Sequence, residues 1–511
     1  MNDQHYVIGV DIGTTSTKAV LFTEKGEVVY QHFIEYPLLI PTVGAAEQNP
    51  QEIFAAVIQS VQALITGSSI HPSKILCLSF SAAMHSLIAV DSNHQLLTNS
   101  ITWADNRSAK WATFLKQKGQ GHEIYRRTGT PIHAMSPLVK LIWLRHEQPQ
   151  LFEKAAKFIS IKEYVFYQLY QQYIVDYSIA SATGLMNLKA LTWDPEALEV
   201  AGITEAQLSK LVPTTYQIHQ IDETMAAQMG IPADVPLVVG ASDGVLANLS
   251  VGAISPGIVA VTVGTSGAVR AVIPQPWTDP KERLFCYALT ENHWVIGGAV
   301  NNGGIILRWI RDQLGANEVA IAQQKGQEPY DLLMALAETI PPGAEGLLFH
   351  PYLAGERAPL WEANASGSFV GLTLRHTRAH LIRAMLEGIA LNLYLVACAL
   401  QEGIGQLKIV QATGGLMRSQ LFRQILADVF QCEIHVPEGY ESAGLGAAVL
   451  GLYALGKIPD LQVVSQMLGE SSHHPPIPEN VEVYRKIIPV YTQVLQQLLG
   501  EYASLAAIAT A

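Results

Sequence analysis

Two short stretches of glycine and hydroxyl residues have the composition of phosphate-binding turns. The first lies in residues 11–18, with the sequence DIGTTSTK, directly after the apolar run 7–10. The second is the stretch GTSG at 264–267, which follows the apolar run 259–263. Small hydroxyl and glycine residues let backbone N–H groups and side-chain OH groups crowd around a phosphate. Two such turns, each after an apolar strand, predict a duplicated fold that holds ATP between its halves.

The residues of these turns supply the first candidate site. The candidate nucleotide-binding residues are Gly13, Thr14, Thr15 and Lys18 from the first turn, with Gly264 and Thr265 from the second. Asp11, at the end of the first strand, adds a carboxylate suited to holding Mg²⁺ through water. A single Gly-Thr-Thr is also common in ordinary turns, so the prediction depends on the pair.

A third strand end carries a carboxylate in the stretch GASDG at 240–244. The small residues around Asp243 would let a sugar approach the side chain closely. Phosphoryl transfer to an alcohol needs a positioned base that accepts the hydroxyl proton late in the reaction. We therefore take Asp243 as the candidate catalytic base. The alternative is that Asp243 only caps a helix that starts at Gly244.

A cluster of polar and aromatic residues follows the predicted strand 75–79. It contains SAAMHS at 81–86 and WADNR at 103–107. Tryptophan offers a flat apolar face to the C–H side of a polyol, while Asp and Arg match vicinal hydroxyls or a carboxylate. The candidate substrate-binding residues are Met84, His85, Trp103, Asp105 and Arg107. For Arg107 the alternative is an exposed arginine at a helix N-terminus.

Glycine pairs between strand and helix form a further candidate. Gly414-Gly415 would let a purine or ribose approach the backbone, and the following helix N-terminus favours phosphate. The stretch NNGG at 301–304 raises the same possibility and adds Gly303 to the candidates. A plain strand-to-helix connection also uses glycine, so both readings stay open.

The histidines give no sign of a metal site. We assign no metal to the isolated His350, His380 and His435, which are expected to be core or surface residues. The adjacent His473 and His474 fall in a predicted loop, where solvated histidines are far more common than ligands.

The candidates must be positioned by alternating strands and helices, which favours an α/β fold. Strands are expected near 6–10, 18–22, 28–34, 75–79, 87–90, 259–263, 294–296 and 407–413. Helices are expected near 50–65, 194–211, 304–313, 418–430 and 443–455. The length of 511 residues exceeds what one core supports, and a second α/β half begins near Asn248. We therefore expect two domains, 1–247 and 248–511.

The composition indicates the compartment of the protein and argues against some classes of partner. A net charge of −12 with no basic block argues against a nucleic-acid partner. The four cysteines are widely spaced and indicate a reduced, cytoplasmic environment. The segment 1–5 lacks the pattern of a signal peptide, and the apolar helix candidate 388–400 is too short to span a membrane. We expect a cytoplasmic protein that does not insert into membranes.

Taken together, these features resemble the FGGY carbohydrate kinases. The stretch 135–144 is similar to the first diagnostic pattern of that family, from which the chain departs at His146. The stretch 367–372, followed by His380-Leu381 and by AMLE at 384–387, matches the second pattern at every specified position. The resemblance covers about residues 6 to 500, in the right order.

Within the family the chain is most similar to bacterial gluconokinases. The stretches that carry this similarity are 46–50, 81–86, 102–107, 289–295 and 350–359. Xylulokinases usually place glycine where this chain has Ser86. The resemblance implies two actin-like (ribonuclease H-like) domains that flank a deep catalytic cleft, with the sugar in the cleft and ATP on the second domain. It also implies that Asp243 is the base and that Met84, His85, Trp103 and Asp105 line the sugar pocket.

The expected activity is ATP- and Mg²⁺-dependent conversion of D-gluconate to 6-phospho-D-gluconate. The partners are then a small sugar acid and ATP, and the sequence leaves a homodimer open. One rival is a xylulokinase or another sugar kinase of the same fold. A rival of another class is an actin-like chaperone or filament ATPase, which the cluster around Trp103 and Asp243 disfavours.

Overall fold

The structure is a computed structural model that describes residues 4–437 and 442–509. Residues 1–3 lie outside this range, and they belong to the segment 1–5, which lacks the pattern of a signal peptide. By internal contacts the chain forms two compact units, each assembled from segments distant in sequence. Unit 1 comprises Met1–Ser255, Val272–Ile296 and Tyr440–Leu468, and unit 2 comprises Pro256–Ala271, Gly297–Gly439 and Gly469–Ala511. The functional division between residues 247 and 248 stays a prediction.

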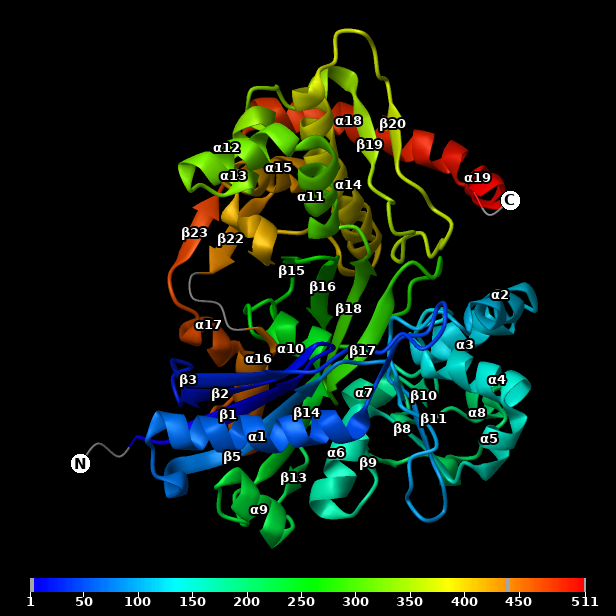
Figure 1. Ribbon diagram of the computed structural model, residues 1–511, viewed down its shortest axis with the longest axis vertical. Coiled ribbons are helices and arrows are strands. Elements are labelled where there is room, and N and C mark those ends of the chain that lie inside the picture. Colours follow the sequence, from blue (N-terminus) through cyan, green and yellow to red (C-terminus); the bar gives the residue numbers. More distant parts are fainter. Residues whose placement is uncertain (1–3, 438–441, 510–511) are drawn as a thin grey trace. The chain divides into compact units, whose positions relative to one another are not determined.

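Unit 1 is built on a six-stranded sheet in the order β13-β14-β5-β1-β2-β3 (Figure 1). The strands are β1 (Tyr6–Ile12), β2 (Ser16–Thr23), β3 (Val28–Glu35), β5 (Ile75–Ala82), β13 (Gln217–Ile218) and β14 (Leu237–Ser242). Strands β1, β5 and β14 run parallel, whereas β2, β3 and β13 are antiparallel to their neighbours. The predicted strands near 6–10, 18–22, 28–34 and 75–79 are confirmed.

The central strands of this sheet are buried on both faces, toward which their side chains point alternately. In β1, Ile8 and Val10 belong to the core that includes helix α1 (Pro50–Ser68). Gly9 faces the other way, toward helix α16 (Ser442–Ala454). A Cβ atom on Gly9 would lie 2.2 Å from the carbonyl oxygen of Gly444, so only glycine allows this close packing. The central strands are therefore fixed from both sides.

Smaller elements complete unit 1. The helices are α2 (Ala109–Gln117), α3 (Gln120–Thr128), α4 (Pro137–Glu147), α5 (Pro149–Lys154), α6 (Ile161–Tyr170), α7 (Tyr177–Ser181), α8 (Pro195–Ala201), α9 (Glu223–Met229), α10 (Asp243–Leu249) and α17 (Val464–Met467). The short strands are β4 (Glu47–Gln48), β6 (Ile88–Val90), β7 (Ser100–Ile101), β8 (Lys157–Ile159), β9 (Ile174–Asp176), β10 (Met186–Asn187), β11 (Thr192–Trp193), β12 (Lys210–Val212) and β17 (Phe285–Thr290).

The predicted helix over 194–211 is wrong beyond Ala201. Helix α8 ends at Gly202, which adopts a left-handed conformation with φ of 78° and donates its N–H back to the last turn. Such a glycine cap stops a helix. The end of the predicted segment instead forms β12, which pairs in parallel with β9.

The second sheet has seven strands in the order β17-β18-β16-β15-β21-β22-β23. They include β15 (Ile258–Val263), β16 (Gly267–Ile273), β18 (His293–Val300), β21 (Ile409–Thr413), β22 (Glu433–Pro437) and β23 (Ser471–His474). Strand β15 is antiparallel to β16 and parallel to β21, which is parallel to β22, and β23 is antiparallel to β22. The order β18-β16-β15-β21-β22-β23 thus repeats the order β3-β2-β1-β5-β14-β13. The duplicated α/β fold is confirmed.

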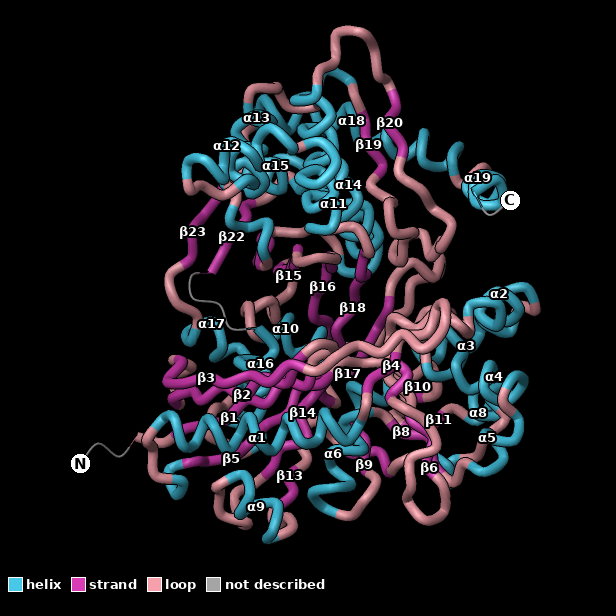
Figure 2. The backbone as a smooth tube through the Cα atoms, viewed as in Figure 1, coloured by secondary structure: helices cyan, strands magenta, loops and turns pink. Residues whose placement is uncertain are grey.

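The helices of unit 2 are α11 (Gly304–Trp309), α12 (Ala316–Lys325), α13 (Pro329–Glu338), α14 (Arg378–Ile404), α15 (Gln420–Phe430), α18 (Pro478–Leu498) and α19 (Tyr502–Ala509). Strands β19 (Leu348–His350) and β20 (Ser368–Val370) pair with one another, and a long loop joins them (Figure 2).

Helix α14 is longer than the predicted segment 388–400, because it already begins at Arg378 and spans 27 residues. The prediction that it is too short to cross a membrane is therefore wrong. Within the described ranges it is the one helix with the length and apolar composition of a membrane span. However, 78% of its apolar window is buried inside the structure, as in the core helix of a folded domain.

Candidate functional site

Three predicted site segments lie at one edge of the unit 1 sheet. Asp11 is near the end of β1, residues 83–85 follow β5, and Asp243 follows β14. In the register of the sheet, Asp11 pairs with Ser81 and Ser81 pairs with Ala241. Because the carboxyl ends of neighbouring parallel strands meet at one edge, the sheet brings these segments together.

The first predicted phosphate turn closes the hairpin between β1 and β2. The N–H of Gly13 donates to the carbonyl of Ser16 at 2.9 Å, and the hydroxyl of Tyr36 donates to the carbonyl of Gly13 at 2.8 Å. The amide of Gln48 donates to the carbonyl of Thr14 at 2.6 Å. The turn is thus held through its carbonyl oxygens, while Thr15 at its tip is exposed.

Asp11 is half-buried beside this turn and accepts a hydrogen bond of 2.7 Å from the Ser81 hydroxyl. Burial raises the pKa of Asp11, while the Ser81 hydrogen bond and the charge of Lys18 act to lower it. Lys18 stands opposite Asp11 in the β1–β2 register. Mg²⁺ is usually held by one or two carboxylates, water and substrate phosphates, and Asp11 beside a phosphate turn fits that pattern.

Asp243 is placed by a bulge in β14. Gly240 has φ of 73°, and the register of β14 against β5 shifts between Val238 and Ala241. A Cβ atom on Gly240 would lie 1.8 Å from the carbonyl oxygen of Phe80, so the bulge requires glycine. The strand then leads into α10, whose first residue is Asp243.

The alternative of a helix cap can now be compared with the geometry. Ser242, rather than Asp243, occupies the N-cap position of α10. The Asp243 carboxylate accepts a hydrogen bond of 2.7 Å from the N–H of Gly244, so it does stabilise the first turn. Asp243 is nevertheless only half-buried. Its role as base stays a prediction.

A buried polar group behind Asp243 was missed by sequence reasoning. The ammonium of Lys162 donates to Asp176 at 2.8 Å and to the carbonyl of Ala241 at 3.2 Å. The hydroxyl of Ser178 donates to the Ser242 hydroxyl at 3.0 Å and accepts from the Ser242 N–H at 3.1 Å. Burial lowers the pKa of Lys162, and Asp176 opposes this. These contacts fix the two residues that precede Asp243.

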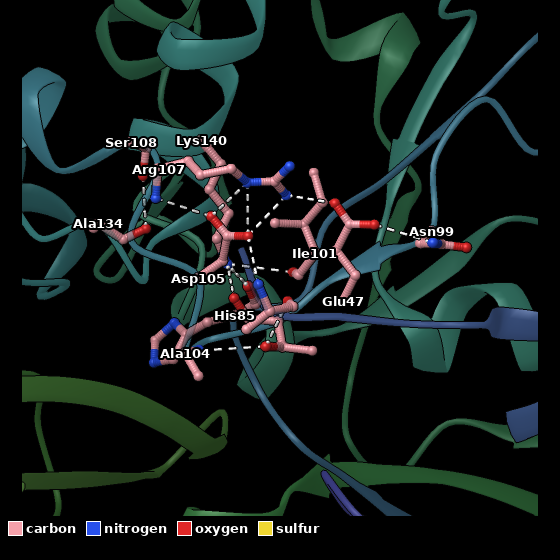
Figure 3. A network of polar contacts seen from close by, with 12 residues as sticks. Glu47, His85, Asn99, Ile101, Ala104, Asp105, Arg107, Ser108, Ala134 and Lys140 are labelled. Atoms are coloured by element: carbon pink, nitrogen blue, oxygen red, sulfur yellow. Dashed lines mark hydrogen bonds and ion pairs between the residues drawn. The ribbon is translucent and has the colours of Figure 1, made fainter. Parts of the chain in front are cut away.

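Arg107 and two carboxylates form the network of Figure 3. Asp105 is 0% exposed and accepts from the N–H of Ala46 at 2.9 Å and from Arg107 Nε at 2.9 Å. Arg107 Nη2 donates to Glu47 at 2.6 Å. The guanidinium also lies 4.6 Å from the ring centroid of Trp143. Asp105 is therefore occupied by protein donors, and the charge of Arg107 is already balanced by two carboxylates.

Lys140 joins the two halves of the predicted substrate cluster. It is buried, and its ammonium donates to the carbonyls of His85 at 2.6 Å and Thr102 at 2.7 Å (Figure 3). Burial lowers the pKa of Lys140 to about 7, while the nearby Asp105 acts to raise it. Lys140 lies in the stretch 135–144 that resembles a family pattern. The signal in the sequence that could have pointed to Lys140 is its position as a lysine within an otherwise apolar run of the helix.

The remaining cluster residues point to different neighbours. His85 has φ of 69°, and its Nδ1 donates to the carbonyl of Ala182 at 2.7 Å. Trp103 Nε1 donates to the Thr14 hydroxyl at 3.0 Å, so the indole touches the first phosphate turn. Met84 is half-buried against the core on the α16 side of the sheet. Arg107 and Glu47 line a cavity of about 580 Å³ together with Asn99, Trp143 and Gln148.

The second predicted phosphate turn joins β15 and β16 in unit 2. The N–H of Gly304 donates to the carbonyl of Gly264 at 2.6 Å. The N–H groups of Gly303 and Ile305 donate to the carbonyl of Thr265 at 3.2 and 3.0 Å. The first N–H groups of α11 are thus used by the turn itself. A Cβ atom on Gly303 would lie 2.7 Å from the carbonyl oxygen of Ser266, so Gly303 is needed for close packing.

Gly414 and Gly415 differ in their surroundings. Gly414 has φ of 100°, and a Cβ atom there would lie 2.4 Å from the carbonyl oxygen of Val263. At Gly415 a Cβ atom would meet no described heavy atom within 4 Å. Gly414 therefore serves the packing of β21 on β15, whereas Gly415 leaves room for a ligand to approach.

Comparison with known proteins agrees with this geometry. The chain matches the N-terminal domain of the FGGY family of carbohydrate kinases over residues 6–250 and the C-terminal domain over residues 259–455. It is 56% identical to a gluconokinase from Bacillus licheniformis, over 98% of each chain. Two solved structures from Lactobacillus acidophilus align with a TM-score of 0.93. One is a gluconate kinase with 39% identity and the other a ligand-bound xylulose kinase with 40% identity, and each covers 98% of this chain and 100% of the other. The family expected from the sequence patterns is confirmed, and the chain belongs to the FGGY family of carbohydrate kinases.

Proposed function

We propose that this protein is a gluconokinase, which transfers the γ-phosphoryl group of ATP to the C6 hydroxyl of D-gluconate. The products are 6-phospho-D-gluconate and ADP. The observation that carries this proposal is the 56% identity to a gluconokinase over 98% of both chains. The two solved structures alone do not separate gluconate from xylulose, because their identities to this chain are nearly equal.

In the proposed reaction Asp243 is the base. As the bond from the C6 oxygen to the γ-phosphorus forms, the bond to the β-phosphate bridging oxygen breaks. The hydroxyl proton moves to the Asp243 carboxylate late in this step, so a carboxylate of ordinary basicity suffices. The contacts of Lys162 and Ser178 to residues 241 and 242 support the role, because they fix the backbone that carries Asp243.

The nucleotide is assigned to the two turns and the glycine pair. Gly13, Thr14, Thr15 and Lys18 are proposed to hold phosphate from one side, and Gly264, Thr265 and Gly303 from the other. Gly414 and Gly415 would pack against the adenosine, and the open space at Gly415 supports this. Mg²⁺, held through water by Asp11, would neutralise phosphate charge when bound. In this scheme residues 1–247 bind the sugar and residues 248–511 bind ATP.

The sugar is assigned to Met84, His85, Trp103 and Arg107, with Asp105 as a supporting residue of the same cluster. The hydrogen bond from Trp103 to Thr14 supports a pocket next to the phosphate turn. Because Asp105 is enclosed by protein donors, we assign it the role of orienting Arg107 instead of touching the sugar. Arg107 already forms ion pairs with Glu47 and Asp105. A gluconate carboxylate bound to Arg107 would therefore have to share the guanidinium donors with Glu47.

We place the enzyme in the cytoplasm, without a membrane or nucleic-acid partner, and a homodimer remains compatible with the proposal. A coupled assay of ADP release tests the function. Release that depends on D-gluconate is expected for the kinase. Release from ATP at the same rate without any sugar would instead support the rival actin-like ATPase and overturn the proposal.

A further inference from the structure

Three side chains with metal-binding atoms meet at the edge of the unit 2 sheet. Glu433 and His435 lie two residues apart on β22, so they face the same side of the sheet. His473 stands directly opposite His435 in the antiparallel β22–β23 register. Residues 471–474 therefore form a strand, and the predicted loop around His473 is wrong.

The distances among these side chains suit one shared ion. His435 Nε2 lies 3.3 Å from Glu433 Oε2, and His473 Nδ1 lies 3.2 Å from Glu433 Oε1. One ligand atom from each residue lies within 4.8 Å of the other two. Tetrahedral Zn²⁺ with bonds of about 2.0–2.2 Å has ligand atoms about 3.3–3.6 Å apart. The 3.3 Å between His435 Nε2 and Glu433 Oε2 falls in that range, whereas His473 Nδ1 approaches the other oxygen of the carboxylate, Oε1, at 3.2 Å.

A buried nitrogen supports the same reading. His435 Nε2 is shielded from solvent and makes no hydrogen bond with any described residue, although Glu433 lies close. Its contact with the carboxylate thus has the distance of a hydrogen bond without the direction. Buried polar atoms rarely remain without a partner, and an ion between the three side chains would supply one.

The side-chain amide of Gln411 lies next to His435 and is a candidate hydrogen-bond acceptor for its ring. Gln411 pairs with His435 in the parallel β21–β22 register, and its Oε1 is also buried without a hydrogen bond to the described part of the chain. Histidine ligands of metals usually donate their other ring N–H to an oxygen acceptor. Gln411 stands beside His435 in the register, and its Oε1 would have to turn toward the ring to provide that acceptor.

We propose that Glu433, His435 and His473 form a binding site for Zn²⁺. Two imidazoles and one carboxylate are a common zinc ligand set, with water in the fourth position. Mg²⁺ prefers oxygen ligands and would not select this site. The proposal goes beyond the kinase reaction and departs from the expectation that these histidines carry no metal.

The location gives the ion a structural role. Strand β22 ends at Pro437, shortly before the chain enters the unit 1 segment that starts at residue 440. Strand β23 begins at Ser471, shortly after that segment ends at Leu468. Zn²⁺ therefore clips together the two strands by which the chain leaves unit 2 and returns to it.

The test is Zn²⁺ binding by the full-length protein, after chelator treatment and in the presence of excess Mg²⁺. Equilibrium dialysis and competition against Co²⁺, followed by the visible absorption of protein-bound Co²⁺, give stoichiometry and affinity. We expect one tight site per chain. His473→Ala is the main variant because this side chain is 54% exposed and its removal spares the core. It should weaken binding at least about 100-fold, and Glu433→Gln should weaken it as well.

His474→Ala is the matched control. His474 neighbours His473 but points to the other side of β23, where its ring lies 3.4 Å from Arg423. It should leave Zn²⁺ affinity and the Co²⁺ spectrum unchanged. Equal Zn²⁺ affinity of wild type and His473→Ala, or equal losses in His473→Ala and His474→Ala, would overturn the proposal. So would the absence of a tight site in a wild-type protein that is folded by circular dichroism.

Discussion

The two predicted phosphate turns occupy the same place in two sheets of the same strand order, but they are held differently. The turn after β1 is held by side chains from three other segments, through Tyr36, Gln48 and Trp103. The turn after β15 is held by backbone N–H groups at the start of α11. The strand order thus fixes where a turn lies, whereas the neighbouring segments determine which groups donate hydrogen bonds to it. The first turn also contacts the predicted sugar cluster, through the hydrogen bond from Trp103 to Thr14.

The strand ends next to these turns also differ. In unit 1, β14 leads through the Gly240 bulge to Asp243, a carboxylate. In unit 2, β21 leads to Gly414 and Gly415, which present backbone only. The comparison suggests a division in which the first sheet edge supplies acid–base groups and the second supplies space for the nucleotide.

The largest expected effect tests the acid–base half of this division. Asp243→Asn keeps the shape of the side chain and its contact with the Gly244 N–H, but it cannot take a proton at neutral pH. We expect kcat to fall by about 10²-fold or more, with ATP binding and thermal stability retained. Steady-state kinetics and nucleotide titration would show this. A variant that keeps more than about a tenth of wild-type kcat would remove Asp243 as the base.

The next effect compares the two turns directly. A Cβ atom at Gly264 would meet only the Ser266 carbonyl at 3.9 Å, whereas one at Gly13 would lie 3.1 Å from the Ser16 carbonyl. Gly264→Val should therefore leave stability near wild type and raise the KM for ATP about 10-fold or more, by blocking phosphate approach. Gly13→Val should impair both stability and nucleotide use.

Gly303→Ala serves as the contrast to Gly264→Val, because a Cβ atom there would lie 2.7 Å from a carbonyl oxygen. It should lower the melting temperature. Unchanged ATP kinetics in Gly264→Val and Gly13→Val would contradict the shared hold on phosphate.

A smaller effect tests the coupling that is special to the first turn. Trp103→Phe removes the hydrogen bond to the Thr14 hydroxyl, a loss of about 1 kcal/mol, or about 5-fold in kcat/KM. A double-mutant cycle with Thr14→Val should show that the two losses are not additive. Trp111→Phe, which breaks a surface hydrogen bond to Glu147, should have no effect on catalysis. Additive losses would mean that the turn and the sugar cluster work independently.

The last effect is on stability rather than on catalysis and concerns Lys140, which supports the cluster in unit 1. Its pKa is lowered from 10.5 to about 7, so between these values the unfolded chain binds a proton that the folded chain does not. Stability should therefore rise with pH across this window and fall as pH drops toward 7. Urea unfolding at pH 7.5 and 9.5 should show a rise about 2.5 kcal/mol larger for wild type than for Lys140→Met. Equal changes would show that Lys140 stays charged throughout.

The sequence predicted the elements whose signals are local. Strands such as β1, β5, β15 and β21 were visible as apolar runs, and the paired turns followed from glycine and hydroxyl residues after β1 and β15, whereas β23 was mistaken for a loop. The helix over 194–211 failed because the stop at Gly202 depends on its left-handed backbone, which the apolar pattern conceals. The start of α14 was missed because its first turns carry polar residues before the apolar run.

The candidate site was predictable only where one residue type carries the chemistry. Asp243 and the glycines could be singled out by composition and position. The supports could not, because they join distant segments: Lys162 reaches Ala241, and Lys140 reaches His85 and Thr102. The enclosure of Asp105 by Arg107 and the Ala46 N–H likewise depends on tertiary packing.

The central claim is that the substrate is D-gluconate, and a comparison of kcat/KM values tests it most directly. A site whose donors pair with a sugar-acid carboxylate leaves those donors unpaired when a neutral ketose binds. Coupled assays of ADP release should give a kcat/KM for D-gluconate at least about 10²-fold above those for D-xylulose and glycerol. Comparable values for D-xylulose would contradict the gluconokinase assignment and leave a sugar kinase of the same family with another substrate.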